Sequence, residues 1–116
     1  MVLNKLRILC FGEAMLELSN LNYTENVSSI GFAGDTLNTA IYLKRLLGES
    51  AQVDYLTVLG RDPISDRLEK YMASEGIGTN PIRRVNNRTI GVYAIDNETG
   101  GAVSYTHLTL PTIYSV

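Results

Sequence analysis

Two segments in the first half of the chain have the hydrophobic pattern of β-strands. Residues 6–11 are mainly apolar and stop at Gly12, which is typical of a buried strand. Residues 53–59 alternate between apolar and polar side chains and stop at Gly60. Residues 15–18 are also rich in apolar side chains, and they either extend the sheet or form its edge.

Two other segments have apolar residues at the spacing of an amphipathic helix. The first follows the glycine-containing stretch at residues 31–38 and ends before Gly48, which stands where a helix C-cap belongs. The second starts with Asp62 as N-cap and Pro63 as the first helical residue, and Gly76 closes it. The predicted buried faces consist of Leu37, Ala40, Ile41, Leu43, Leu46 and Leu47 in the first helix and Ile64, Leu68, Tyr71 and Met72 in the second.

The rest of the pattern indicates further β-structure. Residues 19–29 are polar and are typical of a loop or an exposed hairpin. Residues 82–85 and 90–95 have strand patterns, and the turn-forming pair Asn86-Asn87 predicts that they form a hairpin. Because strand, helix, strand, helix and hairpin follow one another, we predict an α/β fold with antiparallel strands added on one side.

Composition narrows the function classes. The 116 residues include 10 basic and 12 acidic ones, and the resulting net charge of −2 argues against a nucleic-acid-binding surface. A single cysteine, Cys10, and a single histidine, His107, exclude an intramolecular disulfide framework and the common multi-Cys and His-rich metal clusters. The apolar run from Ile8 to Phe11 is too short for a membrane span of about 20 residues or for the hydrophobic part of a secretory signal. We therefore expect one globular domain in the cytoplasm.

Candidate chemistry is concentrated at the start of the first predicted helix. Neither the Walker phosphate loop nor the dinucleotide-binding fingerprint occurs in the sequence. Residues 33–38 instead combine Gly34, which lets the backbone approach a ligand, with the carboxylate of Asp35 and the amide of Asn38. Carboxylate and amide together supply acceptors and donors for sugar hydroxyl groups. The alternative is that Asp35 only caps the helix and Gly34 only turns the chain.

Other polar side chains have more than one interpretation. Glu13 and Glu17 follow the first predicted strand, where open α/β sheets bind ligands, but exposed edge-strand charges explain them equally well. The basic group of Arg83, Arg84 and Arg88 either pairs with an acidic substrate or, as we favour, forms a solvated face. Core or edge packing is the default interpretation of Tyr93 and Tyr105, and Cys10, in an apolar strand, is interpreted as an inert buried thiol.

Five segments, taken together, are more informative than the single motifs above. They are Gly12–Leu18, Gly31–Ala40, Leu59–Pro63, Glu75–Ile77 and Gly91–Tyr93. In continuous order they resemble the PfkB/ribokinase-like carbohydrate kinases. Within that family the resemblance is greatest to the kinases that act on 2-keto-3-deoxygluconate. It covers about residues 6–101 and is therefore more specific than any single motif.

This resemblance implies a central sheet flanked by helices, and a small β-sheet lid over the substrate with strands from about residues 19–32 and 82–101. It implies transfer of the γ-phosphoryl group of ATP to a hydroxyl group of a sugar acid, with Mg²⁺ neutralising the phosphates. The full-length protein is expected to form a homo-oligomer through the lid. The sugar-binding residues that it implies are Gly34, Asp35, Asn38 and Tyr93.

The sequence also departs from the family pattern. The family's Gly-Ala-Gly-Asp segment with its catalytic base is absent, so no catalytic, cofactor-binding or metal-binding residue is assigned, and the chain itself is expected to be inactive. Where a Tyr-Trp-Arg stretch would bind the substrate carboxylate, the chain has Tyr105-Thr106-His107. The alternatives are a fructose- or ribose-specific kinase of the same family and a non-catalytic sugar-binding module.

The chain is expected to consist of two parts of different origin. Residues 1–101 are interpreted as the N-terminal part of a PfkB-type sugar kinase domain. Residues 102–116 are interpreted as a non-native tail, because residues 103–112 resemble one reading frame of a sequencing-library adapter and residues 103–116 contain no charged side chain. The alternative is a natural short protein with an apolar last strand, and the codons of the gene would decide between the two.

Overall fold

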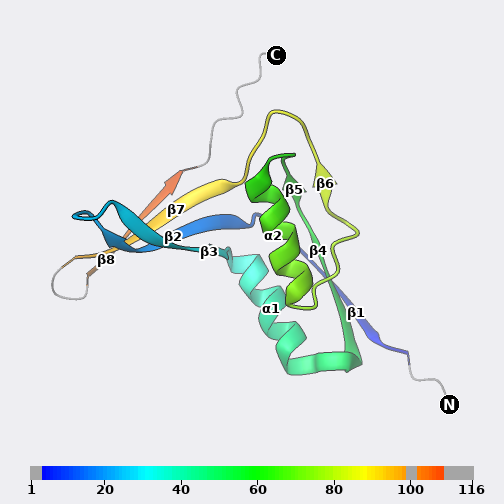
Figure 1. The fold of residues 1–116 in the computed structure, drawn as a ribbon. Coiled ribbons are helices and arrows are strands. Elements are labelled where there is room, and N and C mark those ends of the chain that lie inside the picture. Colours follow the sequence, from blue (N-terminus) through cyan, green and yellow to red (C-terminus); the bar gives the residue numbers. More distant parts are fainter. Residues whose placement is uncertain (1–3, 99–101, 109–116) are drawn as a thin grey trace.

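A computed structural model describes residues 4–98 and 102–108 as a mixed α/β arrangement, which confirms the predicted fold class (Figure 1). Two helices and a short 3₁₀ turn lie among eight strands in the described residues. In chain order the elements are β1 (Leu6–Phe11), β2 (Met15–Asn22), β3 (Val27–Ala33), α1 (Asp35–Leu47), the 3₁₀ turn Gly48–Ser50, β4 (Ala51–Leu56), β5 (Val58–Leu59), α2 (Pro63–Ser74), β6 (Arg83–Arg84), β7 (Gly91–Glu98) and β8 (Ala102–Leu108).

The hydrophobic core lies between the helices and a parallel pair of strands. β1 and β4 run parallel, and α1 and α2 lie in front of them in Figure 1. The side chains that meet there from α1, β4 and α2 include Leu37, Ala40, Ile41, Val53, Tyr55, Leu68 and Met72. Alternate residues of β4 are buried because only one face of the strand points toward the helices.

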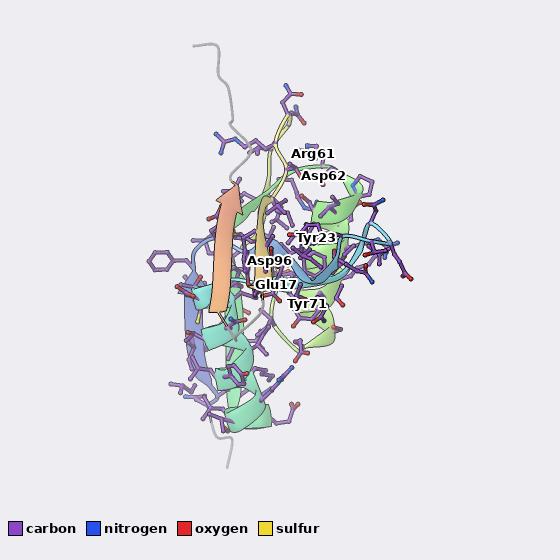
Figure 2. The ribbon with its side chains drawn as sticks, turned by 90° about the vertical axis from the view of Figure 1, so that its left-hand side faces the viewer. Glu17, Tyr23, Arg61, Asp62, Tyr71 and Asp96 are labelled. Atoms are coloured by element: carbon purple, nitrogen blue, oxygen red, sulfur yellow. The ribbon has the colours of Figure 1, made fainter. Side chains whose placement is uncertain are left out.

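A second, four-stranded sheet extends away from the helices in the order β3-β2-β7-β8 (Figure 1). β2 and β3 are antiparallel, so residues 19–29 include an exposed hairpin, one of the two predicted alternatives. Its turn contains Asn26 at φ 58°, a conformation that asparagine tolerates. Tyr23 in this turn donates a hydrogen bond to Asp96 of β7 at 2.7 Å, and both are labelled in Figure 2.

The predicted helix boundaries are confirmed. α1 ends at Leu47, and its C-cap is Gly48, which has φ 55°. α2 begins with Asp62 as N-cap, whose carboxylate accepts a hydrogen bond from the Ser65 backbone N–H at 3.1 Å, and Pro63 is its first residue. Gly76 follows α2 with φ 81°. Each of these capping residues acts on backbone groups within one helical turn, so the local sequence determines where the helix begins or ends.

Several predicted details are wrong. The hairpin of residues 82–95 does not form: Asn86 and Asn87 do make a turn, but β6 pairs in parallel with β5 and β7 pairs in parallel with β2. The single strand predicted at residues 53–59 is two strands, β4 and β5, because they belong to different sheets. Two side chains assigned to helix buried faces are exposed, at 82% for Leu46 and 40% for Ile64.

The predicted tail lies only partly within the described residues. Residues 102–108 form β8, which pairs antiparallel with β7. Residues 109–116 lie outside the described residues, as do residues 99–101 at the end of the predicted lid segment. The non-native origin of the tail and the lid role of about residues 19–32 and 82–101 stay predictions.

Candidate functional site

A cavity of about 370 Å³ lies where the start of α1 meets the four-stranded sheet. Three elements that are far apart in the sequence form it: β2, the N-terminus of α1, and β7. Its lining residues are Met15, Glu17, Gly34, Asp35, Asn38, Tyr93 and Ile95. All four sugar-binding residues implied by the family resemblance therefore line the same cavity.

Gly34 joins β3 to α1 at a position that a larger residue would not fit. Its φ of 146° is a conformation that side chains with a Cβ rarely adopt. A Cβ built there would lie 2.5 Å from the carbonyl oxygen of Glu13. The start of α1 thus packs closely against the chain between β1 and β2, and the Gly34 carbonyl accepts the hydrogen bond of the Asn38 N–H at 2.8 Å.

Asp35 and Asn38 occupy the first turn of α1. Gly34 is the N-cap and no side chain caps the helix, so the alternative that Asp35 serves as the cap is wrong. Both side chains are exposed, and among the described residues neither the Asp35 carboxylate nor the Asn38 amide has a hydrogen-bond partner. One acceptor group and one group that both donates and accepts are therefore available at the cavity wall.

The opposite wall carries a paired carboxylate and phenol. Glu17 of β2 and Tyr93 of β7 are direct neighbours in the parallel register of these strands. The Tyr93 hydroxyl donates a hydrogen bond to Glu17 Oε1 at 2.5 Å, between groups 76 residues apart in the sequence. Of the two interpretations of Glu17, the ligand-side position is the one that the structure supports, because this residue lines the cavity.

The cavity is acceptor-rich and carries negative charge. Among the described residues, its ionisable lining groups are the carboxylates of Glu17 and Asp35, together with the phenol of Tyr93, and none of these lining residues is a lysine or an arginine. Met15 and Ile95 supply apolar surface beside these polar groups. A wall that combines apolar side chains with hydrogen-bonding groups suits a ligand with hydroxyl groups on a carbon skeleton.

A buried contact holds α1 against the first sheet. The Tyr55 hydroxyl of β4 lies 2.6 Å from Thr36 Oγ1 in the first turn of α1. Tyr55 is fully buried, and this burial raises the pKa of its phenol from the ordinary value, although the Thr36 hydrogen bond opposes that rise. The neutral phenol therefore fixes the helix end that carries Asp35 and Asn38.

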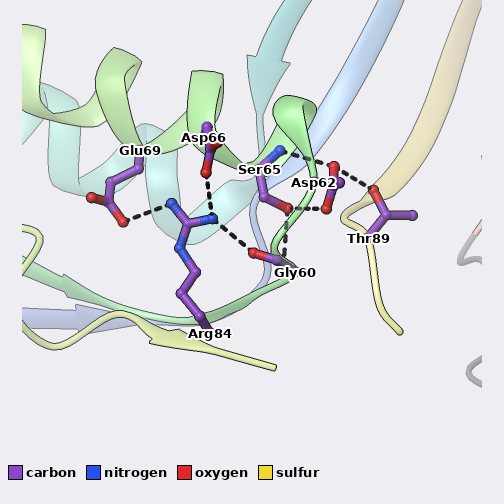
Figure 3. Close-up of polar contacts among 7 residues, drawn as sticks. All are labelled: Gly60, Asp62, Ser65, Asp66, Glu69, Arg84 and Thr89. Atoms are coloured by element: carbon purple, nitrogen blue, oxygen red, sulfur yellow. Dashed lines mark hydrogen bonds and ion pairs between the residues drawn. The ribbon is translucent and has the colours of Figure 1, made fainter. Parts of the chain in front are cut away.

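A polar network at the start of α2 is shown in Figure 3 and ties this helix to the segment that leads into β7. The Asp62 carboxylate accepts hydrogen bonds from the Ser65 hydroxyl at 2.7 Å and from the Thr89 hydroxyl at 3.1 Å. Burial alone would raise the pKa of Asp62, but the hydrogen bonds from Ser65 and Thr89 outweigh it and lower the pKa from its ordinary value. Because Thr89 precedes β7, the network positions the strand that carries Tyr93.

Arg84 of β6 belongs to the same region and has a structural role. Its guanidinium contacts Asp66 at 2.9 Å, Glu69 at 3.0 Å and the Gly60 carbonyl at 2.7 Å (Figure 3). The favoured interpretation as part of a solvated face is therefore wrong for this arginine, whose side chain is only 22% exposed. It clamps β6 to α2.

The remaining candidate side chains lie outside the cavity lining. Glu13 lies beside Gly91, because a Cβ added to Gly91 would lie 2.9 Å from the Glu13 carboxylate. Arg83 and Arg88 are exposed. Cys10 is partly buried, and burial raises the pKa of its thiol, which agrees with the prediction of an inert thiol.

ATP and Mg²⁺ do not fit the residues that the structure describes. Within residues 4–98 and 102–108 no three Asp, Glu, His or Cys side chains come together as metal ligands. The carboxylates of Glu17 and Asp35 would repel a triphosphate, and the sequence has no phosphate loop. We therefore derive no phosphoryl-transfer step from these residues. Among the described residues, no helix has the length and apolar character needed to cross a membrane.

Two lining residues, Met15 and Ile95, were not predicted from the sequence. Met15 is two residues before Glu17 on β2, and Ile95 is two residues after Tyr93 on β7. Residues two apart in a strand point to the same face of the sheet, so each lies on the same face as a predicted candidate. The period-2 spacing could have identified them once the face of either strand was known.

Comparison with known proteins agrees with this arrangement. The sequence model of the pfkB family of carbohydrate kinases matches residues 5–107. The 2-dehydro-3-deoxygluconokinase of Dickeya dadantii is 39% identical over 95 residues, which are 81% of this chain and 30% of that protein. The enzyme of the same name from Escherichia coli K12 is 36% identical over 98 residues, which are 82% of this chain and 30% of that protein.

Solved structures show the same fold. A 2-dehydro-3-deoxygluconokinase from Thermotoga maritima superposes with a TM-score of 0.78 at 21% identity over 90% of this chain and 32% of that one. A fructokinase from Xylella fastidiosa with bound ATP superposes with a TM-score of 0.75 at 26% identity over 90% of this chain and 31% of that one. This chain thus spans about a third or less of these relatives. The family match over nearly all of its length shows that the chain belongs to the PfkB family of carbohydrate kinases.

Proposed function

We propose that this chain forms the sugar-binding part of an ATP-dependent kinase that phosphorylates a hydroxyl group of 2-keto-3-deoxygluconate. The observation that carries the proposal is the convergence of Gly34, Asp35, Asn38 and Tyr93 on one cavity. The names of the Dickeya dadantii and Escherichia coli relatives support the choice of substrate.

Each cavity group has a distinct role in this proposal. Gly34 allows the backbone to approach the sugar, Asp35 accepts hydrogen bonds from its hydroxyl groups, and Asn38 both donates and accepts. Tyr93 contacts the sugar from the four-stranded sheet, and Glu17 orients its phenol through their hydrogen bond. The cavity therefore fixes the sugar before any chemistry occurs, and such positioning is a large part of catalysis in a two-substrate reaction.

The chemistry itself is assigned to the rest of a full-length kinase. We place the aspartate base, the ATP site and Mg²⁺ there, so this chain alone is expected to show no turnover. The cytoplasm is the proposed location because ATP is available there. The proposed lid, and the contact of a homo-oligomer, consists of strands from about residues 19–32 and 82–101. Residues 102–116 remain, in this proposal, a non-native tail.

Titration calorimetry with 2-keto-3-deoxygluconate tests the binding role. We expect heat of binding for the unsubstituted chain and about a three- to tenfold weaker affinity for Asn38→Ala, which loses the hydrogen bonds of one amide. Asn80→Ala is the matched control, because Asn80 is exposed and lies outside the cavity. Absence of binding, or an equal loss in both variants, would contradict the sugar-binding role. ATP-dependent turnover by the chain alone would contradict the assignment of the chemistry.

A neutral sugar is the second candidate substrate, and the charge of the cavity favours it. A sugar acid brings a carboxylate, whereas the part of the cavity lining that the structure describes offers two carboxylates and no lysine or arginine. The same titration with fructose and ribose separates these substrates by their relative affinities. A non-catalytic sugar-binding module is distinguished by a full-length clone that binds the sugar without phosphorylating it.

A further inference from the structure

The first turn of α1 carries side chains with two different surroundings. Asp35 and Asn38 line the cavity, whereas the Thr36 hydroxyl contacts the buried phenol of Tyr55 in β4. A helix has about 3.6 residues per turn, so neighbouring side chains such as Asp35 and Thr36 leave it in different directions. The orientation of the sugar-binding side chains therefore depends on what holds the Thr36 side of the same turn.

Tyr55 provides a rigid support for this turn. β4 pairs with β1 on one side, and on the other side the Tyr55 N–H donates to the Gly78 carbonyl at 3.0 Å. The Tyr55 side chain is fully buried, and its hydroxyl lies 2.6 Å from Thr36 Oγ1. Because burial raises the pKa of this phenol, it stays protonated at neutral pH and keeps the hydrogen that the pair shares.

Gly12 encloses the Thr36 side chain from another direction. Gly12 follows β1, and its N–H donates to the Leu56 carbonyl at 3.2 Å, which ties it to the end of β4. A Cβ built on Gly12 would overlap Thr36 Oγ1 and lie 3.0 Å from Thr36 Cβ and Cγ2. The Thr36 side chain therefore occupies the space that Gly12 leaves open, and it meets the ends of both parallel strands there.

We propose that Thr36 and Tyr55 are positioning residues for sugar binding, and that their hydrogen bond fixes the orientation in which α1 presents Asp35 and Asn38 to the cavity. The inference rests on the proposed function, because it concerns the same cavity. A hydrogen bond is restricted in distance and angle, so it defines the position of the turn more narrowly than the apolar contacts of α1 do. Binding groups that are displaced by about 1 Å lose much of their effect.

Paired substitutions separate positioning from stability. Thr36→Val leaves the buried Tyr55 hydroxyl without this partner and should lower the midpoint of thermal unfolding by about 5–15 °C. In the double variant Thr36→Val/Tyr55→Phe both polar groups are replaced by apolar groups of similar shape, which is nearly neutral for stability. The midpoint should therefore return to within about 5 °C of that of the unsubstituted chain, although the directional contact is absent.

Titration calorimetry of the full 116-residue chain with 2-keto-3-deoxygluconate, and with fructose as a second sugar, tests the inference. We expect about three- to tenfold weaker affinity in Thr36→Val, in Tyr55→Phe and also in the double variant, despite its recovered stability. Thr36→Ser keeps the hydroxyl and should retain the affinity within about twofold. Tyr71→Phe is the matched control, since the Tyr71 hydroxyl lies outside the cavity and has no hydrogen-bond partner among the described residues.

Hydrogen exchange adds a readout that needs no sugar. The Asn38 N–H donates to the Gly34 carbonyl at 2.8 Å and closes the first turn of α1, so its exchange should be at least about threefold faster in the double variant. Full sugar affinity in the double variant, an equal loss in Tyr71→Phe, or unchanged exchange at Asn38 would overturn this inference alone. If the unsubstituted chain binds neither sugar, the proposed function fails and this inference fails with it.

Discussion

Replacing Gly34 by alanine should strongly destabilise the junction that places Asp35 and Asn38. The φ of 146° at Gly34 costs a residue with a Cβ about 1–3 kcal/mol. The new Cβ would also lie 2.5 Å from the Glu13 carbonyl oxygen, which is backbone and has little freedom to move. Together these effects predict a loss of about 2–4 kcal/mol in the free energy of unfolding. For a domain of this size the midpoint of thermal unfolding should fall by about 10–30 °C.

Gly48→Ala provides the matched control. Gly48 also has a positive φ, at 55°, but no atom lies within 4 Å of the Cβ that alanine would add. This substitution measures backbone strain alone and should cost about 1 kcal/mol. Thermal and urea unfolding of both variants, followed by circular dichroism, gives the two losses. If Gly34→Ala is no more destabilising than Gly48→Ala, the close approach of α1 to Glu13 does not stabilise the junction.

Two further predictions concern α2. Asp62→Ala removes the N-cap and should cost about 1 kcal/mol at neutral pH, measured by urea unfolding. Because the folded-state pKa of Asp62 is lowered, the contribution of its carboxylate to the free energy of unfolding is present above the ordinary carboxyl pKa. This contribution is lost as the pH falls through the lowered pKa. A difference in stability between variant and parent that persists in strong acid would contradict this. Leu68→Ala should cost about 2–5 kcal/mol because Leu68 is fully buried, whereas Leu46→Ala, at an 82% exposed position, should change stability by about 0.5 kcal/mol or less. Equal losses in urea unfolding would show that α2 does not pack as described.

The helices were predictable because their signals are local. Asp62, Pro63 and Gly48 each act on backbone groups within one turn, and the structure places all three where the sequence pattern predicts. The buried faces were less predictable. Leu46 and Ile64 have the right spacing but are exposed, because the width of the covered stripe depends on how many elements pack against each helix.

The pairing of the strands could not be predicted from the local sequence pattern. Asn86 and Asn87 do form a turn, yet the strands on either side of it enter different sheets. A turn pair reports only the bend of the chain, whereas the partner of a strand is decided by surfaces distant in sequence. β6 finds β5 and β7 finds β2, both in parallel, so the segment between them crosses from one sheet to the other instead of folding back.

The same long-range pairing creates the candidate site. In the predicted hairpin β7 would pair with β6, and nothing would place Tyr93 opposite Glu17. In the parallel register with β2 these two side chains are neighbours, and their hydrogen bond aligns the sheet face that meets Asp35 and Asn38. The resemblance named four residues that line this cavity, but not their geometry. Glu17 stayed ambiguous because only the pairing of β2 with β7 decides which face it shares. Local motifs therefore supply the side chains of the cavity, but the pairing of strands in the sheet brings them together.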